Sequence, residues 1–258
     1  MNHSLLVGEK ATARLFVVLG LVFGSFASAL SHRLPRGEPV VADRSRCPCC
    51  GAVLTARDLV PLLSWVIARA RCRHCGAPVS WRYPLIELTM AAVFLAAWRC
   101  AGGDSAGGIL LALTGFGLVV IVVADLEAGI IPDVMLVSMA PVAVVWRWWT
   151  GGDWVDAASG AIVAVVVLGA ARWAFLAWRG FHGLGMGDVK FVGLAGFYVG
   201  LSGFGTFLVL SGVLGILFGL VWRLSGRGRA FPFGPGLCVA LLLAVFWPGV
   251  FGGDLKIP

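Results

Sequence analysis

The sequence predicts an all-α polytopic membrane protein of about eight transmembrane helices, with a small zinc-ribbon-like cytoplasmic insert after the first helix. Hydrophobic residues make up 59% of the 258 residues, well above the share of about 45–50% in soluble domains. Eight apolar runs, most near the length of about 17–25 residues that crosses a bilayer core, follow one another along the chain. Buried helices of a soluble protein are disfavoured, because little polar sequence remains to cover a core.

The first apolar run, Leu15 to Leu30, is predicted to be a retained span, since no convincing small-residue cleavage site follows it. Seven further spans are placed by their apolar limits, at residues 84–99, 107–124, 130–149, 155–178, 189–199, 204–222 and 234–251. The sixth span, 189–199, is short and rich in glycine.

One sizeable polar segment, residues 32–83, lies between the first two spans. It holds nine arginines against three acids, so the positive-inside rule places it in the cytoplasm. Threading the spans from there puts the turns near Asp125, 180–188 and 223–229 on the same side, which agrees with Arg223, Arg227 and Arg229. The segments "GGDSAGG", "TGGDW" and the C-terminal "GGDLKIP" then lie outside. The net charge of +7 therefore reflects membrane orientation rather than nucleic-acid binding.

Two cysteine motifs occupy this loop. "CPCCG" at 47–51 and "CRHCG" at 72–76 are Cys-x-x-Cys-Gly motifs whose cysteine pairs are separated by 21 residues. Two close thiolate pairs, each with a glycine that lets the chain turn under the metal, suit tetrahedral zinc. The predicted ligands are Cys47, Cys50, Cys72 and Cys75, with Cys49 a neighbour able to substitute for one of them. Disulfides or free thiols are the alternative, which a reducing cytoplasm disfavours.

Two acidic segments are predicted to meet at the cytoplasmic edge of the membrane. In "ADLEAGIIPD", Asp125 ends the third span and Asp133 opens the fourth, while "GMGD" places Asp188 at the start of the sixth. An ionised carboxylate beside a membrane core is costly unless it is paired or functional. Because Asp125 and Asp188 arrive from separate hairpins at the same depth, we expect their carboxylates to form a pair.

Such a pair predicts hydrolysis of a peptide bond. Two carboxylates a few ångströms apart resist ionising together, so one acts as a base toward water while the other donates a proton. Asp125 and Asp188 are the predicted catalytic residues. Gly185 and Gly187 lack a Cβ and would let an extended substrate approach. Lys190 is interpreted as neutralising the cluster or as marking the membrane edge.

Other interpretations of the acids stay open. Asp125 or Asp188 alone suits a helix cap or a solvated interfacial acid, Asp133 suits a cap or a group that tunes the pair, and Glu127 is interpreted as a solvated turn residue. An ion-coupled transporter is an alternative function, although it predicts mid-membrane carboxylates and an internal repeat. A non-catalytic zinc-ribbon membrane scaffold is another, and it leaves the paired aspartates without a role.

Several segments in order along nearly the whole chain resemble the bacterial type IV prepilin peptidases, GxGD-type aspartyl proteases of the peptidase A24 family. They are "GSFASALSHRLPRGE", "CPCCG", "DLVPLLSWVIARARCRHCG", "RYPLIEL", "DLEAGIIPD", "GMGDVK" and "FPFGPGL". The resemblance implies that Asp125 and Asp188 cleave the leader of prepilins or pseudopilins after a glycine, in type IV pilus or type II secretion systems. It further implies S-adenosylmethionine-dependent methylation of the new N-terminal residue, at the cytoplasmic face of the bacterial inner membrane.

The predicted organisation is a first helix at 1–31, a cytoplasmic four-cysteine zinc domain at 32–83 associated with methyl transfer, and an aspartyl peptidase domain at 84–258. "GSFASALSHRLP" departs from the family by an alanine where asparagine and then valine are usual, and the third cysteine of "CPCCG" is unusual. No Gly-x-Gly-x-x-Gly turn locates the methyl donor. Glu87 in "YPLIEL" suits that site and equally suits a structural acid that pairs with the loop's arginines.

Overall fold

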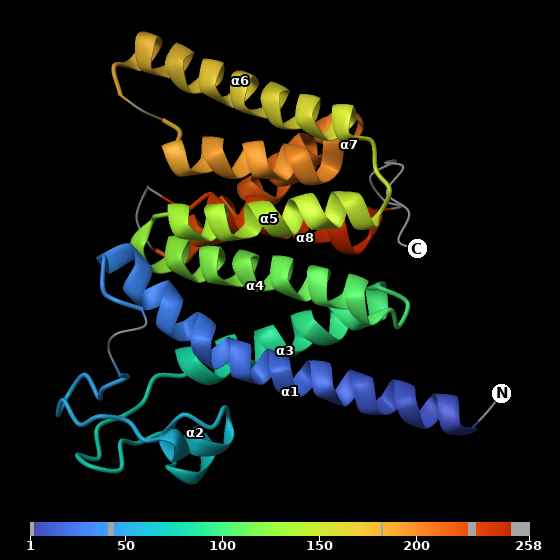
Figure 1. The fold of residues 1–258 in the computed structure, drawn as a ribbon. Coiled ribbons are helices and arrows are strands. Elements are labelled where there is room, and N and C mark those ends of the chain that lie inside the picture. Colours follow the sequence, from blue (N-terminus) through green and yellow to red (C-terminus); the bar gives the residue numbers. More distant parts are fainter. Residues whose placement is uncertain (1–2, 41–43, 182, 227–230, 249–258) are drawn as a thin grey trace.

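The structure, a computed structural model, describes residues 3–40, 44–181, 183–226 and 231–248 (Figure 1). In these ranges the chain is helical and contains no β-strand. The elements are α1 (His3–Arg33), η1 (Leu34–Arg36), η2 (Ala56–Asp58), α2 (Leu63–Ile67), α3 (Arg82–Cys100), α4 (Ser105–Ala128), α5 (Asp133–Trp149), α6 (Trp154–Arg179), α7 (Met186–Leu224) and α8 (Gly234–Phe246).

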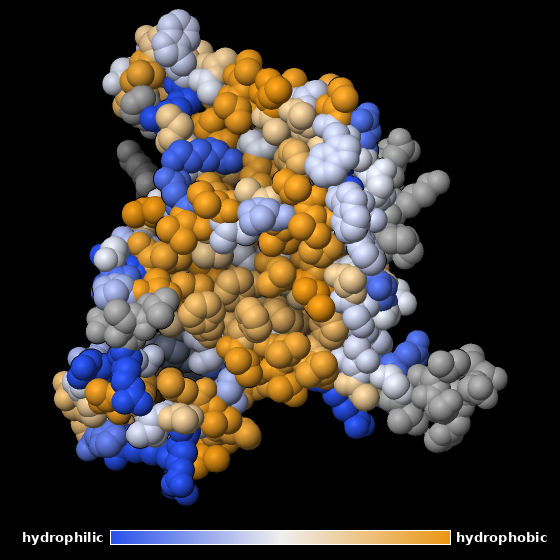
Figure 2. All heavy atoms as spheres, in the orientation of Figure 1, coloured by the Kyte–Doolittle hydropathy of each residue, from blue (hydrophilic) through white to orange (hydrophobic). Residues whose placement is uncertain are grey.

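The long helices form a membrane-spanning bundle, which confirms the predicted fold class. Within the described ranges, α1, α3, α4, α6 and α7 are long and apolar enough to cross a membrane. α5 has 17 residues and α8 has 13. Figure 2 shows hydrophobic residues over the middle of the bundle and hydrophilic residues gathered toward its two ends. The predicted end of the eighth span at Phe251, the segment "GGDLKIP", and Arg227 and Arg229 lie outside the described residues.

The predicted sixth and seventh spans are the two halves of α7. Gly200 interrupts the helix with φ 73° and ψ 172°, a conformation that glycine adopts readily. The beginning of α7 approaches Ile131 beside α5, and Gly215 in its second half approaches Phe233 beside α8. Both ends of α7 therefore lie at the end of the bundle where the loops before α5 and α8 meet, so the chain crosses the bundle twice.

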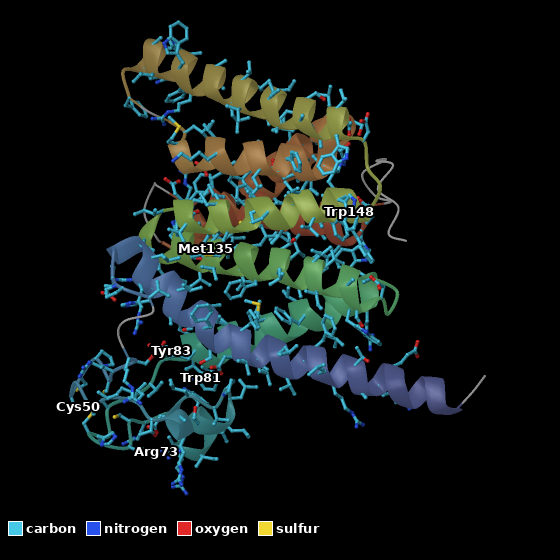
Figure 3. The ribbon with its side chains drawn as sticks, viewed as in Figure 1. Cys50, Arg73, Trp81, Tyr83, Met135 and Trp148 are labelled. Atoms are coloured by element: carbon cyan, nitrogen blue, oxygen red, sulfur yellow. The ribbon has the colours of Figure 1, made fainter. Side chains whose placement is uncertain are left out.

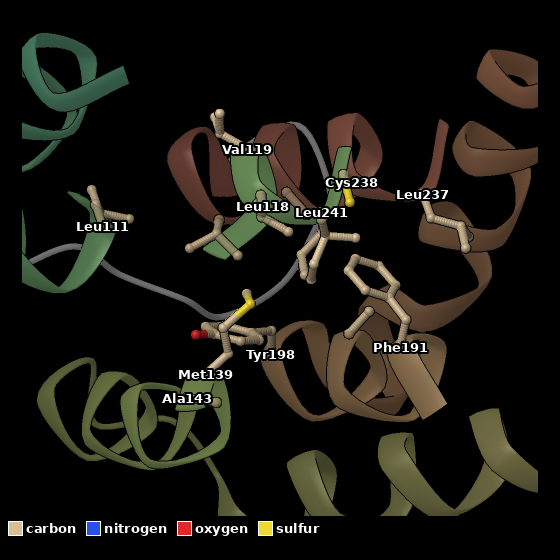
Figure 4. Packing of buried hydrophobic residues seen from close by; sticks show 14 of the residues in the cluster. Leu111, Leu118, Val119, Met139, Ala143, Phe191, Tyr198, Leu237, Cys238 and Leu241 are labelled. Atoms are coloured by element: carbon tan, nitrogen blue, oxygen red, sulfur yellow. The ribbon is translucent and has the colours of Figure 1, made fainter. Parts of the chain in front are cut away.

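A buried core holds α4 against α5, α7 and α8. Leu118 of α4, Met139 of α5, Tyr198 of α7 and Leu241 of α8 are fully buried and converge in Figure 4. The Tyr198 and Thr114 hydroxyl groups lie 3.0 Å apart and join α7 to α4. This packing fixes the relative position of the two helices that carry Asp188 and Asp125.

An ion pair stabilises the opposite end of the bundle. Arg147 of α5 is 3% exposed, and its Nη2 lies 2.9 Å from Oδ2 of Asp156 in α6. Oδ1 of Asp156 also accepts a hydrogen bond of 3.0 Å from the backbone N–H of Ser202, just after the break in α7. Asp156 therefore neutralises the charge of the buried Arg147 and caps the second half of α7.

The variant Asp156→Ala is expected to lose about 3–5 kcal/mol of stability, because it leaves Arg147 buried without its partner. Asp153→Ala in the same turn is the matched control. It removes only the N-cap of α6, a bond of 2.9 Å to Val155 N–H, and should cost about 1 kcal/mol. Thermal unfolding in detergent compares the two variants, and equal losses would contradict the role given to Asp156.

Candidate active site and cysteine centre

Asp125 is held in place by two helices. It lies in the last turn of α4, is 7% exposed, and its Oδ2 accepts a hydrogen bond of 2.8 Å from the backbone N–H of Gly234 at the start of α8. A Cβ on Gly234 would lie 2.6 Å from the same oxygen, so only glycine allows this approach. Gly234 belongs to "FPFGPGL", and sequence reasoning gave it no role of its own.

Asp188 lies in the first turn of α7, where the helix dipole favours an anion. Its Oδ2 accepts a hydrogen bond of 3.1 Å from the backbone N–H of Gly185, so it also caps the helix. A Cβ on Gly187 would lie 3.0 Å from Cβ of Ile131. A side chain at position 187 would therefore press on Ile131, and the glycine allows close packing of α7 on the loop before α5.

The structure brings the six predicted peptidase-site residues to one cleft. Its volume is about 480 Å³, and Asp125 and Asp188 both line it. The predicted residues lining the cleft are Asp125, Asp133, Gly185, Gly187, Asp188 and Lys190. Leu34 and Pro35 of η1 also line it; sequence reasoning missed them, although they lie in the "RLP" segment quoted for the resemblance.

Lys190 and Asp133 form an ion pair at the edge of this cleft. The Lys190 Nζ lies 2.9 and 2.8 Å from the two carboxylate oxygens of Asp133. Asp133 is the first residue of α5 and the acidic residue of its first turn. Lys190 thus neutralises Asp133, and the charge of the Asp125–Asp188 pair is not offset by this lysine.

Glu127 is exposed, which agrees with its interpretation as a solvated residue, but it is a helical residue with an ion-pair partner. Glu127 lies within α4 and forms an ion pair with Arg82 at the start of α3. The Arg82 guanidinium also donates to Ser28 Oγ at 2.6 Å and to Ser31 Oγ at 2.8 Å, both in α1. Since Glu127 is two residues beyond Asp125, this network fixes the end of α4 that carries the aspartate.

The four predicted cysteine ligands form a cluster on two matching hairpins. Cys47 N–H donates to Ala52 O at 2.9 Å, and Cys72 N–H donates to Ala77 O at 2.8 Å. Gly51 and Gly76 close the two turns with φ values of 69° and 73°, in the left-handed region that favours glycine. The repeated geometry brings the two Cys-x-x-Cys pairs face to face, on the side of the insert that carries Cys50 in Figure 3.

The cluster fits a tetrahedral metal. The sulfurs of Cys47, Cys50, Cys72 and Cys75 lie within 4.8 Å of one another, and those of Cys47 and Cys75 are 3.9 Å apart. Zinc–sulfur bonds of about 2.3 Å place tetrahedral sulfurs about 3.8 Å apart. Cys49 is exposed and is not one of the four.

Backbone amides favour the thiolate form that a metal requires. The N–H groups of Cys50 and Cys49 lower the pKa of Cys47 to about 6. The N–H groups of Cys75 and His74 lower the pKa of Cys72 in the same way. The thiolate of the first cysteine in each pair is therefore favoured before a cation such as Zn²⁺ binds.

A second cavity of about 600 Å³ lies between the cysteine insert and the ends of α1 and α3. Glu87 of α3 lines it, is 7% exposed, and accepts a hydrogen bond of 2.8 Å from the backbone N–H of Leu62. Trp65 and Tyr83 supply aromatic surface to the same cavity. Glu87 therefore contacts the loop through the backbone N–H of Leu62, whereas the sequence suggested a pair with the loop's arginines.

Two carboxylates held by separate helices on one cleft define the site of an aspartic hydrolase, here in a helical membrane protein. Residues 18–100 match the family model described as Bacterial Peptidase A24 N-terminal domain, and residues 110–220 match the Type IV leader peptidase family. The chain belongs to the type IV leader peptidase family, which confirms the predicted resemblance.

The curated relatives span most of the chain. It is 33% identical to the prepilin leader peptidase/N-methyltransferase of Burkholderia pseudomallei (strain 1026b), over 90% of this chain and 84% of that protein. It is 31% identical to the protein of the same name from Aeromonas hydrophila, over 90% of both chains. For the Myxococcus xanthus (strain DK1622) protein the identity is 35%, over 90% of this chain and 70% of that protein. No solved structure matches the chain significantly.

Proposed function

We propose that this chain is a prepilin leader peptidase and N-methyltransferase of the bacterial inner membrane. It cleaves the leader of type IV prepilins or pseudopilins after a glycine and methylates the new amino terminus, with the cleft and the cysteine insert facing the cytoplasm. The observation that carries the proposal is the single cleft lined by Asp125 and Asp188, in a chain 33% identical to such an enzyme over 84% of its length.

We infer that Asp125 and Asp188 hydrolyse the peptide bond together. Each has its Oδ2 engaged by a backbone N–H, which leaves its Oδ1 for water and substrate. The ionised carboxylate of the pair takes a proton from water, and the protonated one donates to the scissile carbonyl oxygen. The attacking oxygen bonds to the carbonyl carbon and gives a diol. The carboxylic acid formed in the first step then protonates the leaving amine, the other carboxylate takes a proton from a diol hydroxyl, and the peptide bond breaks.

Cys47, Cys50, Cys72 and Cys75 are assigned as ligands of a structural zinc ion. The insert has little core of its own: in residues 44–81 the only hydrophobic residue that is buried is Cys47. A metal cross-link therefore supplies the stability that packing does not.

The cavity beside Glu87 is assigned to the methyl donor. Its volume lies in the range of about 300–1,000 Å³ of small-molecule sites. Buried carboxylate and aromatic surface suit a cationic nucleoside, and S-adenosylmethionine would supply the methyl group there. Glu87 attracts the positive charge of the donor, while Trp65 and Tyr83 offer rings for stacking.

The proposed function is tested by incubating the membrane-reconstituted protein with a prepilin and with S-adenosylmethionine, and by reading the mass of the product. The expected product is the pilin without its leader and with one added methyl group. A product with the leader intact would contradict the peptidase, and a cleaved product that never gains a methyl group would contradict the methyltransferase alone.

Glu87→Gln is expected to reduce methylation by about tenfold or more and to leave cleavage unchanged, because it removes a charge facing the donor. The amide oxygen of glutamine can still accept the Leu62 N–H, so the insert stays attached to α3. Glu9→Gln, at an exposed position of α1, is the matched control. The ratio of methylated to unmethylated product measures the effect, and an unchanged ratio would contradict the assignment of the cavity.

A further inference from the structure

The cysteine insert carries an apolar surface that the preceding sections leave without a partner. It consists of Leu59, Val60, Leu63, Val66 and Ile67, in α2 and the turn before it, and is called the α2 face below; at its edge, Leu59 also lines the Glu87 cavity. These side chains are between 41% and 70% exposed. An exposed apolar patch of this kind marks an interaction site. Whether lipid or a protein covers it depends on how deep α2 lies relative to the membrane.

Contacts between α2 and α3 place the α2 face at the edge of the hydrocarbon. The residue before α2, Leu62, donates its N–H to Glu87 at 2.8 Å. α3 has 19 residues and is about 28 Å long at about 1.5 Å per residue, so it just spans a core of about 30 Å. Glu87 lies five residues after Arg82, about 7 Å inside the start of α3. α2 therefore begins at the depth of the first turns of a membrane span.

A pair of tryptophans places α2 at the same depth in the membrane. The rings of Trp65 in α2 and Trp81, the residue before α3, have centroids 4.2 Å apart. Trp81 is 72% exposed, and tryptophan favours the membrane–water interface. On α3 itself, Leu85 and Leu88 are 65% and 54% exposed. The membrane-facing side of α3 and the exposed apolar groups of the insert thus belong to one region at one depth.

The charges around the α2 face suit a membrane surface. Arg57 precedes the face by two residues, Arg69 follows it by two residues, and both are exposed. An exposed apolar surface flanked by arginines, here Arg57 in η2 and Arg69 after α2, binds at the boundary between headgroups and acyl chains, more strongly on anionic lipid. Figure 2 shows hydrophobic residues of the insert next to the bundle, and hydrophilic residues on its outer edges.

We propose that the α2 face is a lipid-docking surface, embedded at the headgroup–acyl boundary of the leaflet on the side of the cysteine insert, with anionic headgroups beside Arg57 and Arg69. The depth of α2 and its connection to α3 favour lipid over a protein partner. The docking holds the Glu87 cavity at the membrane surface, on the same end of the bundle as the Asp125–Asp188 cleft. The proposal does not depend on the proposed enzymatic function.

The test uses the photo-cross-linking amino acid p-benzoylphenylalanine at Ile67 of the full-length protein, reconstituted in vesicles of phosphatidylcholine and phosphatidylglycerol. The matched control is the same amino acid at Cys49. This residue is next to Cys50, which lies at the outer edge of the cysteine insert in Figure 3. After irradiation, mass spectrometry is expected to find phospholipid adducts at position 67, at least about fivefold more than at position 49.

Other results would overturn the proposal. A cross-linked dimer would identify a second copy as the partner, a cross-link to added prepilin would identify the substrate, and equal labelling at positions 67 and 49 would show a solvated face. Wild-type protein in vesicles that contain a lipid with a shallow acyl-chain diazirine gives a second measurement without any substitution. Adducts are expected on residues 59–67, and their absence there would likewise refute lipid docking.

Discussion

Asp125→Asn and Asp188→Asn are each expected to lower the rate of prepilin cleavage by about 10³-fold or more, which corresponds to about 4 kcal/mol of lost transition-state stabilisation. The amide neither takes a proton from water nor donates one as a carboxylic acid does. Its oxygen still accepts the N–H of Gly234 or Gly185, which bonds the native carboxylate at 2.8 or 3.1 Å. The loss is therefore expected in the chemical step, with the fold preserved.

Single-turnover cleavage of a prepilin, read by mass, measures this loss, and thermal unfolding in detergent monitors the fold. Asp104→Asn is the matched control on α4, since Asp104 caps the far end of that helix through Gly107 N–H at 2.5 Å and asparagine caps equally well. Cleavage by either active-site variant at a rate near that of the control would refute a two-carboxylate mechanism.

The sequence predicted the spans well because their signal is local. Each spanning segment can be recognised from its own run of apolar residues. The predicted boundary between 189–199 and 204–222 agrees with the break at Gly200. The order of the spans also fixes which turns share one end of the bundle. Because successive spans cross the membrane in opposite directions, their order places Asp125 and Asp188 at the same end of the bundle before any contact between their helices is known.

The contacts that shape the site could not be predicted, because each joins segments far apart in the chain. Gly234 reaches Asp125 across 109 positions, and Glu127 reaches Arg82 across 45. A glycine in an apolar segment or an acid near a helix end has many explanations until its neighbour is known. The ion pair of Glu127 was missed for this reason, since a carboxylate at a span end was interpreted without the arginine that the fold brings to it.

The cysteine insert illustrates the opposite case, in which spacing alone predicts the cluster. The Cys-x-x-Cys-Gly pattern encodes the hairpin, the left-handed glycine and the amides that lower the pKa of its first cysteine, all within five residues. Two copies of a local structure need only face each other to form a four-sulfur site, and the structure brings their sulfurs within 4.8 Å. Sequence reasoning left the role of Cys49 open.

Removal of the metal is expected to unfold the insert and abolish methylation, while cleavage falls by less than about tenfold. Structural zinc contributes about 10–16 kcal/mol to the folding of small domains, and the insert has little other core. The cleft is lined mainly by residues of α4, α5, α7 and the loops between them, and from the predicted domain 32–83 only Leu34 and Pro35 are among its described lining residues. Cys50→Ser is expected to reduce the metal content from about one ion per chain to none.

Cys49→Ser is the matched control, since Cys49 is exposed and outside the four-sulfur cluster. It should keep the metal, resist limited proteolysis between residues 44 and 81, and methylate at the wild-type rate. Metal analysis, proteolysis and product mass report on the same samples. If both variants lost the metal equally, the assignment of four ligands would be wrong; if Cys50→Ser lost cleavage and methylation together, the insert would be required by the peptidase cleft as well.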